Sequence, residues 1–177
     1  MLTTSDTPMP TAPATYTTIE SRLGDLTVVA RGGGIAGLYF PRHWHMPGQV
    51  GFGERSDAGF GDVQEQLGEY LAGERRSFQL PVCAHGSPFQ KRVWDLLRQI
   101  PYGETATYGE LARDLGGCVT AQEVGAAVGR NPVCILIPCH RVLGAGGKLT
   151  GYAGGLGRKR FLLDLEREAA PRSARLF

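Results

Sequence analysis

A cysteine and a histidine stand side by side as Cys139 and His140, in the string IPCHRV (137–142). Cysteine attacks electrophiles as the thiolate, and a nearby imidazole is the usual base that forms a thiolate at neutral pH. Adjacent residues of a strand point to opposite faces, so the two can cooperate only through a turn or a linking water. Pro138 favours such a turn. The pair predicts nucleophilic chemistry, although adjacency alone does not define a reaction.

The remaining cysteines and the nearby histidines indicate no metal site. The four cysteines form no CxxC pair and no zinc-type spacing, so free thiols are expected rather than two disulfides. Cys83 and Cys134 stand among apolar neighbours and are expected in the core, and Cys118 is the fourth thiol. His43 and His45 lack a third ligand nearby and are expected at the surface.

Length and charge set broad limits. A chain of 177 residues can form one domain or two small ones, and no apolar run is long enough to cross a membrane. Residues 1–85 hold six Arg and nine acidic residues, whereas residues 86–177 hold thirteen Lys or Arg and eight acidic residues. A basic half beside an acidic half is typical of a nucleic-acid-binding protein, although ordinary solvated charge gives the same counts.

The first unit is expected to be a small α/β domain over residues 15–84. Residues 16–40 alternate β-branched and polar residues around turn signals, which predicts two or three strands. A loop over 41–61, a helix over 62–74 and a strand over 77–82 follow. Residues 1–14 are rich in Thr, Pro and Ser and lack a secretion signal, so a disordered tail and a cytoplasmic protein are expected.

The second unit, residues 85–170, is expected to be mainly helical. Ser87 and Pro88 begin a helix that ends before Pro101. Thr107 and Thr120 are N-cap residues, each followed three residues later by Glu, and begin two short helices with the outline of a helix-turn-helix. The Ala and Gly spacing of the helix over 121–130 suits either packing against another helix or entry into a DNA groove.

The end of this unit surrounds the Cys-His pair. Residues 134–138 are expected to form a short strand, and residues 144–155 a glycine-rich hairpin or loop. A helix follows over 157–170, with a basic first turn at Arg158, Lys159 and Arg160. Because positive charge opposes the dipole at a helix N-terminus, this turn is expected to serve a contact outside the helix. Residues 171–177 are a C-terminal tail.

Three strings resemble the O6-alkylguanine-DNA alkyltransferase family: IPCHRV (137–142) preceded by GRNP (129–132), GYAGGLGRKRFLLDLE (151–166), and FQKRVWDLLRQIPYGETATYGELA (89–112). The resemblance covers nearly all of residues 16–166 and is looser in the first unit. It implies an N-terminal ribonuclease-H-like α/β domain followed by a C-terminal winged helix-turn-helix domain, which enters the minor groove and flips the damaged guanine into a pocket.

The resemblance also implies the roles of five catalytic residues. Cys139 falls at the alkyl-accepting nucleophile, His140 at the residue that takes its proton through a water, and Glu166 at the carboxylate that orients the histidine. Tyr108 falls at the tyrosine that protonates guanine N3 and helps to rotate the phosphate. Asn131 falls at the residue that braces the turn.

The same resemblance places a guanine pocket and a DNA surface. The implied substrate-binding residues are Val128, Val142, Tyr152, Ala153 and Gly154. The implied DNA-binding residues are Thr107, Gln122, Gly125, Ala126, Arg130 and Arg141. This chain departs from the family at Gln122, where an arginine usually fills the gap left by the flipped base, and at Ala153, where serine is frequent.

The implied reaction is a stoichiometric transfer of the alkyl group of O6-alkylguanine, and of O4-alkylthymine, to Cys139. The implied partner is double-stranded DNA that carries the lesion, bound by a monomer without metal, cofactor or membrane. One alternative is an alkyltransferase-like protein, which binds the lesion without repair and replaces the nucleophile, often by tryptophan. The other is a Cys-His hydrolase, which would need an oxyanion hole.

Overall fold

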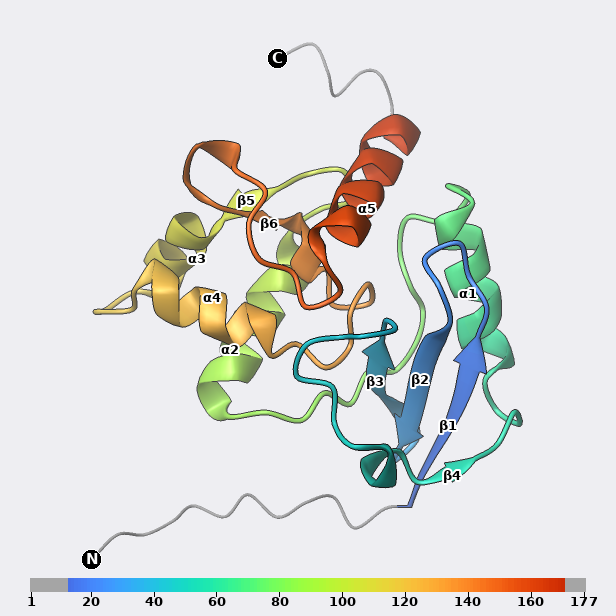
Figure 1. The fold of residues 1–177 in the computed structure, drawn as a ribbon. Coiled ribbons are helices and arrows are strands. Elements are labelled where there is room, and N and C mark those ends of the chain that lie inside the picture. Colours follow the sequence, from blue (N-terminus) through green and yellow to red (C-terminus); the bar gives the residue numbers. More distant parts are fainter. Residues whose placement is uncertain (1–12, 171–177) are drawn as a thin grey trace, which may run out of the picture.

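The structure is a computed structural model that describes residues 13–170 (Figure 1). The predicted tails, residues 1–14 and 171–177, lie outside the described residues except for positions 13 and 14. Ala14 already belongs to the first strand. Figure 1 shows two units side by side, with the larger sheet in one and most of the helices in the other.

The first unit is built on a four-stranded sheet with the strand order β3-β2-β1-β4. Strands β1 (Ala14–Ile19), β2 (Leu26–Arg31) and β3 (Gly34–Tyr39) form an antiparallel meander, and β4 (Glu54–Arg55) pairs parallel to β1. A short 3-10 helix (Gln49–Phe52) precedes β4. Helix α1 (Gly61–Leu71) buries its apolar residues in the core beside the sheet, so the strands predicted within residues 16–40 and the helix predicted over 62–74 are confirmed.

The edge strand β3 forms backbone hydrogen bonds with two later segments of the chain, near residues 81–83 and 132–134. Ile35 of β3 exchanges backbone hydrogen bonds with Pro81 and Cys83, both of 2.8 Å. Leu38 of β3 donates 2.8 Å to Pro132 O and accepts 3.3 Å from Cys134 N. These contacts cover the unpaired groups of an edge strand.

The predictions of strands at 77–82 and 134–138 are wrong. The first segment makes only one bridge, at Val82, and the second is a tight turn in which Ile135 has φ 70°. A positive φ is costly for a β-branched residue, so the surrounding packing must hold this turn. The apolar character of both segments reflects burial beside the sheet, because a short apolar run does not specify a strand.

The second unit contains three short helices with the predicted N-caps. Helices α2 (Pro88–Gln99), α3 (Tyr108–Leu115) and α4 (Ala121–Gly129) begin after Ser87, Thr107 and Thr120, and each cap forms a complete capping box. Each box satisfies backbone donors that the first turn leaves free. Strands β5 (Ala106–Thr107) and β6 (Val142–Leu143) pair in parallel, and α5 (Leu156–Ala169) ends the described chain.

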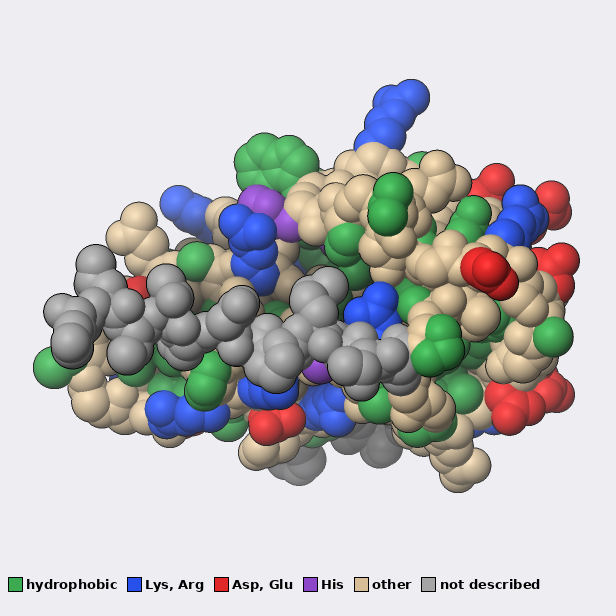
Figure 2. All heavy atoms as spheres, turned by 90° about the horizontal axis from the view of Figure 1, so that it is seen from below, with side chains coloured by type: hydrophobic (Ala, Val, Ile, Leu, Met, Phe, Trp, Pro, Cys, Tyr) green, Lys and Arg blue, Asp and Glu red, His purple; other side chains and the backbone are tan. Residues whose placement is uncertain are grey.

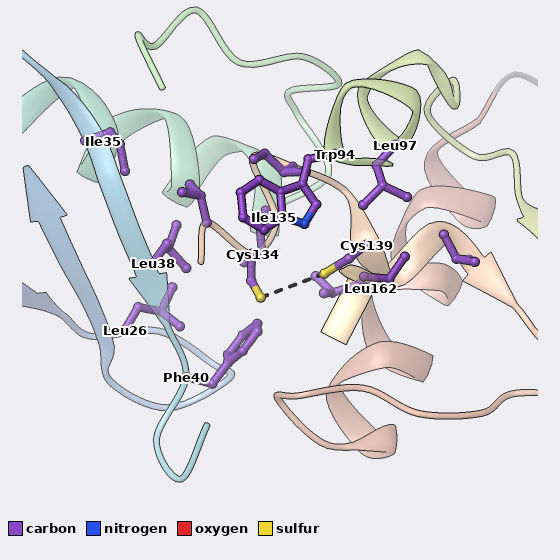
Figure 3. Packing of buried hydrophobic residues seen from close by; sticks show 14 of the residues in the cluster. Leu26, Ile35, Leu38, Phe40, Trp94, Leu97, Cys134, Ile135, Cys139 and Leu162 are labelled. Carbon is purple, nitrogen blue, oxygen red and sulfur yellow. Dashed lines mark hydrogen bonds between the residues drawn. The ribbon is translucent and has the colours of Figure 1, made fainter. Parts of the chain in front are cut away.

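One hydrophobic core runs through both units. Leu26 and Leu38 from the sheet belong to the same cluster as Trp94 and Leu97 of α2 and Leu162 of α5 (Figure 3). The cluster also contains Cys134 and Cys139, so the candidate nucleophile lies at a wall of the core. Packing against this cluster fixes the position of the Cys-His turn more firmly than a surface loop would.

The charged side chains are unevenly distributed. On the face shown in Figure 2, most acidic side chains gather at the end that carries the first unit, and Lys and Arg spread over the rest. No helix in the described part of the chain has the length and hydropathy needed to cross a bilayer. Within residues 13–170, no group of three or more His, Cys, Asp or Glu residues could hold a metal ion.

Candidate active site

The turn that carries Cys139 and His140 is a single 3-10 turn (Cys139–Arg141) directly after Pro138. Asn131 braces it from the preceding loop: its Nδ2 donates 2.9 Å to Ile137 O, and its Oδ1 accepts 3.0 Å from Val133 N. Because Asn131 is buried, these bonds are protected from competition with water. The turn needed for cooperation between the adjacent residues is therefore present.

A buried carboxylate lies behind the histidine. Oε1 of Glu166 lies 2.8 Å from Nε2 of His140, and both side chains are buried. Arg141 donates two bonds to Glu166, from Nε to Oε2 at 2.9 Å and from Nη2 to Oε1 at 2.8 Å. Tyr70 of α1 donates a further bond of 2.7 Å to Oε1. The carboxylate thus fixes the orientation of the imidazole while its own charge is neutralised.

These contacts determine the protonation of the pair. Burial would raise the pKa of Glu166, but the hydrogen bonds from His140 and Arg141 outweigh burial and hold the pKa well below its usual range. Burial lowers the pKa of His140 despite the opposing effect of Glu166. At neutral pH the site therefore holds a carboxylate beside a neutral imidazole, which is able to accept a proton.

The sulfur of Cys139 has a polar environment of its own. The thiol of Cys134 lies 3.8 Å from it, and a hydrogen bond from this thiol lowers the pKa of Cys139, against the effect of burial. Asn131 and the positive charge of Lys159 lower it further. A lowered pKa increases the fraction of reactive thiolate.

Lys159 explains part of the basic first turn of α5. Its side chain is buried, and Nζ donates 2.8 Å to Thr150 O and 3.2 Å to Gly151 O, which ties the glycine-rich loop to the helix. Burial lowers the pKa of Lys159 to about 8, with an opposing effect of Cys139. Arg158 reaches the first unit by donating 2.9 Å to Leu23 O. The turn therefore serves contacts within the protein.

Cys139 opens into a cavity of about 260 Å³ between the two units. Its wall comes from the loop after β3, from α3 and α4, and from the glycine-rich loop. The lining residues are Trp44, His45, Tyr108, Gly125, Ala126, Val128, Gly129, Asn131, Cys134, Cys139, Gly151, Tyr152 and Ala153. A cavity with mostly apolar walls and few polar groups is typical of a site for a small molecule.

The structure brings most of the predicted substrate-binding residues to this cavity. Val128, Tyr152 and Ala153 line it, but Val142 and Gly154 do not. Val142 is fully buried, and a Cβ added to Gly154 would lie 2.4 Å from the ring of Phe40. Gly154 therefore allows close packing behind the cavity wall.

Among the predicted DNA-binding residues, Arg141 is the one whose side chain the structure buries. Its Nη1 donates 2.7 Å to Ile100 O, and its other nitrogens bind Glu166. With this buried guanidinium fully engaged, the prediction that Arg141 binds DNA is wrong. Gln122 and Arg130 are exposed at the two ends of α4. Gly125 and Ala126 line the cavity mouth, and Thr107 is the cap of α3.

The surface prediction for His43 is also wrong. His43 is buried between the rings of Tyr39 and Phe40, and Nε2 lies 3.9 Å from the sulfur of Cys134. Sequence patterns did not reveal this histidine, nor the contacts of Tyr70 and Cys134 at the site. Each of these contacts joins residues distant in sequence or depends on the tight turn, so no local periodicity reports them.

Comparison with known proteins agrees with this arrangement. Residues 14–84 match the family described as 6-O-methylguanine DNA methyltransferase, ribonuclease-like domain, and residues 88–168 match its DNA binding domain. A methylated-DNA--protein-cysteine methyltransferase of Mycolicibacterium paratuberculosis is 48% identical over 92% of this chain and 98% of its own length. A Mycobacterium tuberculosis protein of the same name is 44% identical over the same shares.

A solved structure shows the same fold. The Mycobacterium tuberculosis OGT crystallised in complex with DNA superposes with a TM-score of 0.83 at 43% identity, over 92% of this chain and 99% of that chain. The chain therefore has the two-domain fold of DNA alkyl-group transferases, with an N-terminal ribonuclease-like domain and a C-terminal DNA-binding domain. It belongs to the 6-O-methylguanine DNA methyltransferase family.

Proposed function

We propose that the protein repairs alkylated DNA by direct reversal, moving the alkyl group from O6 of guanine to Cys139. The observation that carries this proposal is the position of one cysteine with a lowered pKa at the wall of a cavity, directly before a buried imidazole held by a carboxylate. The thioether formed is a stable bond that water does not readily cleave. Each molecule therefore acts once.

The proton of the Cys139 thiol passes through a water to His140. Nδ1 of this histidine is buried and has no hydrogen-bond partner within the described residues, while Glu166 holds the other ring nitrogen. The thiolate attacks the alkyl carbon, the carbon–O6 bond breaks, and the electron pair returns to guanine. Charge on the leaving base is neutralised by a proton at N3.

Tyr108 is the donor of the proton to guanine N3. Its ring lies at the cavity, its hydroxyl lies 3.5 Å from Thr150 O, and burial raises its pKa, with a further contribution from Cys139. The hydroxyl therefore keeps its proton at neutral pH and can give it to a base whose basicity rises as the alkyl bond breaks.

DNA binds across α3 and α4, which act as a winged helix-turn-helix. Stacked within the duplex, the alkylated O6 is inaccessible to the cavity, so the nucleotide must be flipped out. The small residues Gly125 and Ala126 leave room for the backbone to approach the cavity mouth. We assign to Gln122 the filling of the gap in the stack and to Arg130 a further DNA contact, because both side chains are exposed at the ends of α4.

The proposed repair reaction implies further properties of the protein. The lesion is O6-alkylguanine, the protein acts as a monomer in the cytoplasm without a cofactor, and the division between the domains falls at residues 84 and 85. Cys139 speaks against the lesion-binding alternative, in which the nucleophile is replaced. The Cys-His hydrolase alternative leaves the helix-turn-helix without a role.

A repair assay under single-turnover conditions tests the proposal. Duplex DNA with one O6-methylguanine is mixed with increasing amounts of protein, and restored guanine is measured. We expect one guanine per protein molecule, with no further product on longer incubation. Cys139→Ala should bind the same duplex and restore none. Continued turnover, or repair by Cys139→Ala, would contradict the proposal.

A further inference from the structure

Two thiols face each other inside the candidate active site. The sulfur atoms of Cys134 and Cys139 are 3.8 Å apart, as Figure 3 shows with a dashed line. Both side chains are buried, and both line the 260 Å³ cavity. The other two cysteines are not part of this pair: Cys83 is half-buried beside Gly34, and Cys118 is exposed.

Backbone contacts fix this pair. Cys134 N donates 3.3 Å to Leu38 O, Cys139 N donates 2.8 Å to Ile137 O, and Cys134 forms a bridge with Ile137. The chain therefore reverses between the two cysteines and returns the second to the side of the first. Two sulfurs in van der Waals contact need only side-chain rotation to come within bonding distance, provided that the backbones are already close.

The two thiols differ in their chemistry. The hydrogen bond from Cys134 lowers the pKa of Cys139, and the same bond, together with burial, raises the pKa of Cys134. Cys139 is therefore the nucleophile of the pair, and Cys134 keeps its proton. A reactive thiolate beside a protonated second thiol is the arrangement in which an oxidised cysteine can be resolved as a disulfide.

We infer that Cys134 and Cys139 form a reversible disulfide when a hydroperoxide enters the cavity, and that this disulfide protects the nucleophile from irreversible oxidation. The inference rests on the proposed function because it assigns a protective modification to the alkyl-accepting cysteine. Cys134 is a resolving residue, and the repair reaction does not require it to change covalently.

The reaction balances with hydrogen peroxide as the oxidant. The Cys139 thiolate attacks one peroxide oxygen, the O–O bond breaks, and hydroxide leaves, so sulfur is oxidised to the sulfenic acid and peroxide is reduced. The sulfur of Cys134 then attacks the sulfenic sulfur. The S–O bond breaks, and the hydroxyl group leaves as water with the thiol proton of Cys134.

Protection matters for a protein that uses its nucleophile once. Without a resolving thiol, sulfenic acid advances to sulfinic and sulfonic acids, from which thiols are not recovered by ordinary reductants. A disulfide stops this advance and is reopened by thiol exchange. The oxidised protein is therefore inactive but recoverable.

The disulfide can be detected on one peptide, because trypsin cleaves after Arg130 and Arg141 and releases both cysteines within residues 131–141. The parent for the test is the full chain with Cys83→Ser and Cys118→Ser. It is treated with hydrogen peroxide, free thiols are blocked with iodoacetamide, and the peptide is weighed. We expect the peptide to lose two hydrogens and take up no blocking group. Dithiothreitol should then restore both thiols and the alkyl-transfer activity.

The matched variant adds Cys134→Ser to the same parent, and each protein is compared with its own untreated activity. We expect its peptide to gain two or three oxygens, and its lost activity to stay lost after dithiothreitol. A parent peptide that gains oxygen without losing hydrogens, or that is unchanged, overturns the inference. Equal recovery of activity by both proteins also overturns it.

The peptide mass separates this inference from the proposed function. A disulfide in a protein that accepts no alkyl group would contradict the proposed function and leave the disulfide established. An alkylated Cys139 in a protein that forms no disulfide would contradict only the inference.

Discussion

The hydroxyl of Tyr70 donates a hydrogen bond of 2.7 Å to Oε1 of Glu166, and so joins α1 of the first unit to α5 of the second. Its oxygen also lies 3.4 Å from Nε2 of His140. The ribonuclease-like domain therefore contributes to the site as well as to the core. It supplies one of the hydrogen-bond donors that hold the Glu166 carboxylate beside His140.

Replacing Tyr70 by phenylalanine should lower the free energy of unfolding by about 1.5–3 kcal/mol, because a hydrogen bond to a buried charge is lost. Repair should slow as well, since Glu166 is held less firmly. Chemical denaturation and single-turnover rates measure both effects. The matched control is Tyr102→Phe, because this nearby hydroxyl is buried without a partner among the described residues. Equal destabilisation by both variants would contradict the role of the Tyr70 bond.

Removing the general base His140, or the carboxylate that orients it, should change both the rate of alkyl transfer and the pH dependence of that rate. His140→Ala or Glu166→Gln should slow alkyl transfer by about 10²–10⁴-fold, the usual contribution of general-base assistance. Because burial lowers the pKa of His140, the parent rate should stay level through neutral pH and fall only in acid, below the pH at which an ordinary histidine gains its proton.

In His140→Ala the rate should instead rise with pH, because only spontaneous ionisation then supplies the thiolate. Rates of alkyl transfer from O6-benzylguanine, measured across the pH range, separate the two pH profiles. A variant profile parallel to that of the parent would count against His140 as the base that takes the proton of Cys139.

Gln122 should limit the flipping step. Glutamine is shorter than arginine and neutral, so it stacks less well and attracts phosphate less. Gln122→Arg is expected to raise the repair rate on duplex DNA and leave the rate on free O6-benzylguanine unchanged, because the free base needs no flipping. Gln99→Arg, at the exposed last residue of α2, controls for added charge alone. If both rates rise together, Gln122 acts elsewhere.

His43 should make the protein less stable in mild acid. Burial lowers its pKa to about 4, with smaller contributions from His45 and Arg158. Below about pH 6.5 the unfolded chain binds a proton that the folded chain does not, so the free energy of unfolding falls as pH falls. The loss between pH 7 and pH 5 should be about 2 kcal/mol.

His43→Gln should reduce this dependence on pH, although His140, whose pKa is also lowered by burial, adds to it in both proteins. Denaturant titrations at several pH values measure the slope, with the exposed His85→Gln as control. If the free energy of unfolding of His43→Gln depends on pH as steeply as that of the parent, then His43 gains its proton at the same pH in the folded and the unfolded chain, which would contradict this prediction.

Local signals in the sequence predicted the elements well, and tertiary contacts explain the failures. The caps Ser87, Thr107 and Thr120 act within one turn, so residue types alone predict them. The apolar run at 134–138 has the composition of a strand, but β3 and the core hold it as a turn. An apolar composition indicates that a segment is buried, but a buried segment can be a strand or a turn.

The catalytic residues could be predicted from the sequence, whereas the other contacts of the site could not. The string around Cys139 carries a family motif, whereas Arg141 within that string was assigned to DNA although it binds Glu166 from a distant helix. The contact of Tyr70 with Glu166 spans the chain from α1 to α5 and depends on how the two units pack. A single sequence carries no signal for such a contact.

Repair by this protein depends on Cys139 accepting the alkyl group and keeping it. The most direct measurement is the fragment mass spectrum of residues 131–141 after the protein has reacted with duplex DNA that carries O6-methylguanine. This peptide contains both Cys134 and Cys139, so fragmentation between them is needed to assign the group. We expect one methyl group on Cys139, still present after prolonged incubation and stoichiometric with the guanine restored. A methyl group on Cys134, or restored guanine with an unmodified peptide, would contradict it.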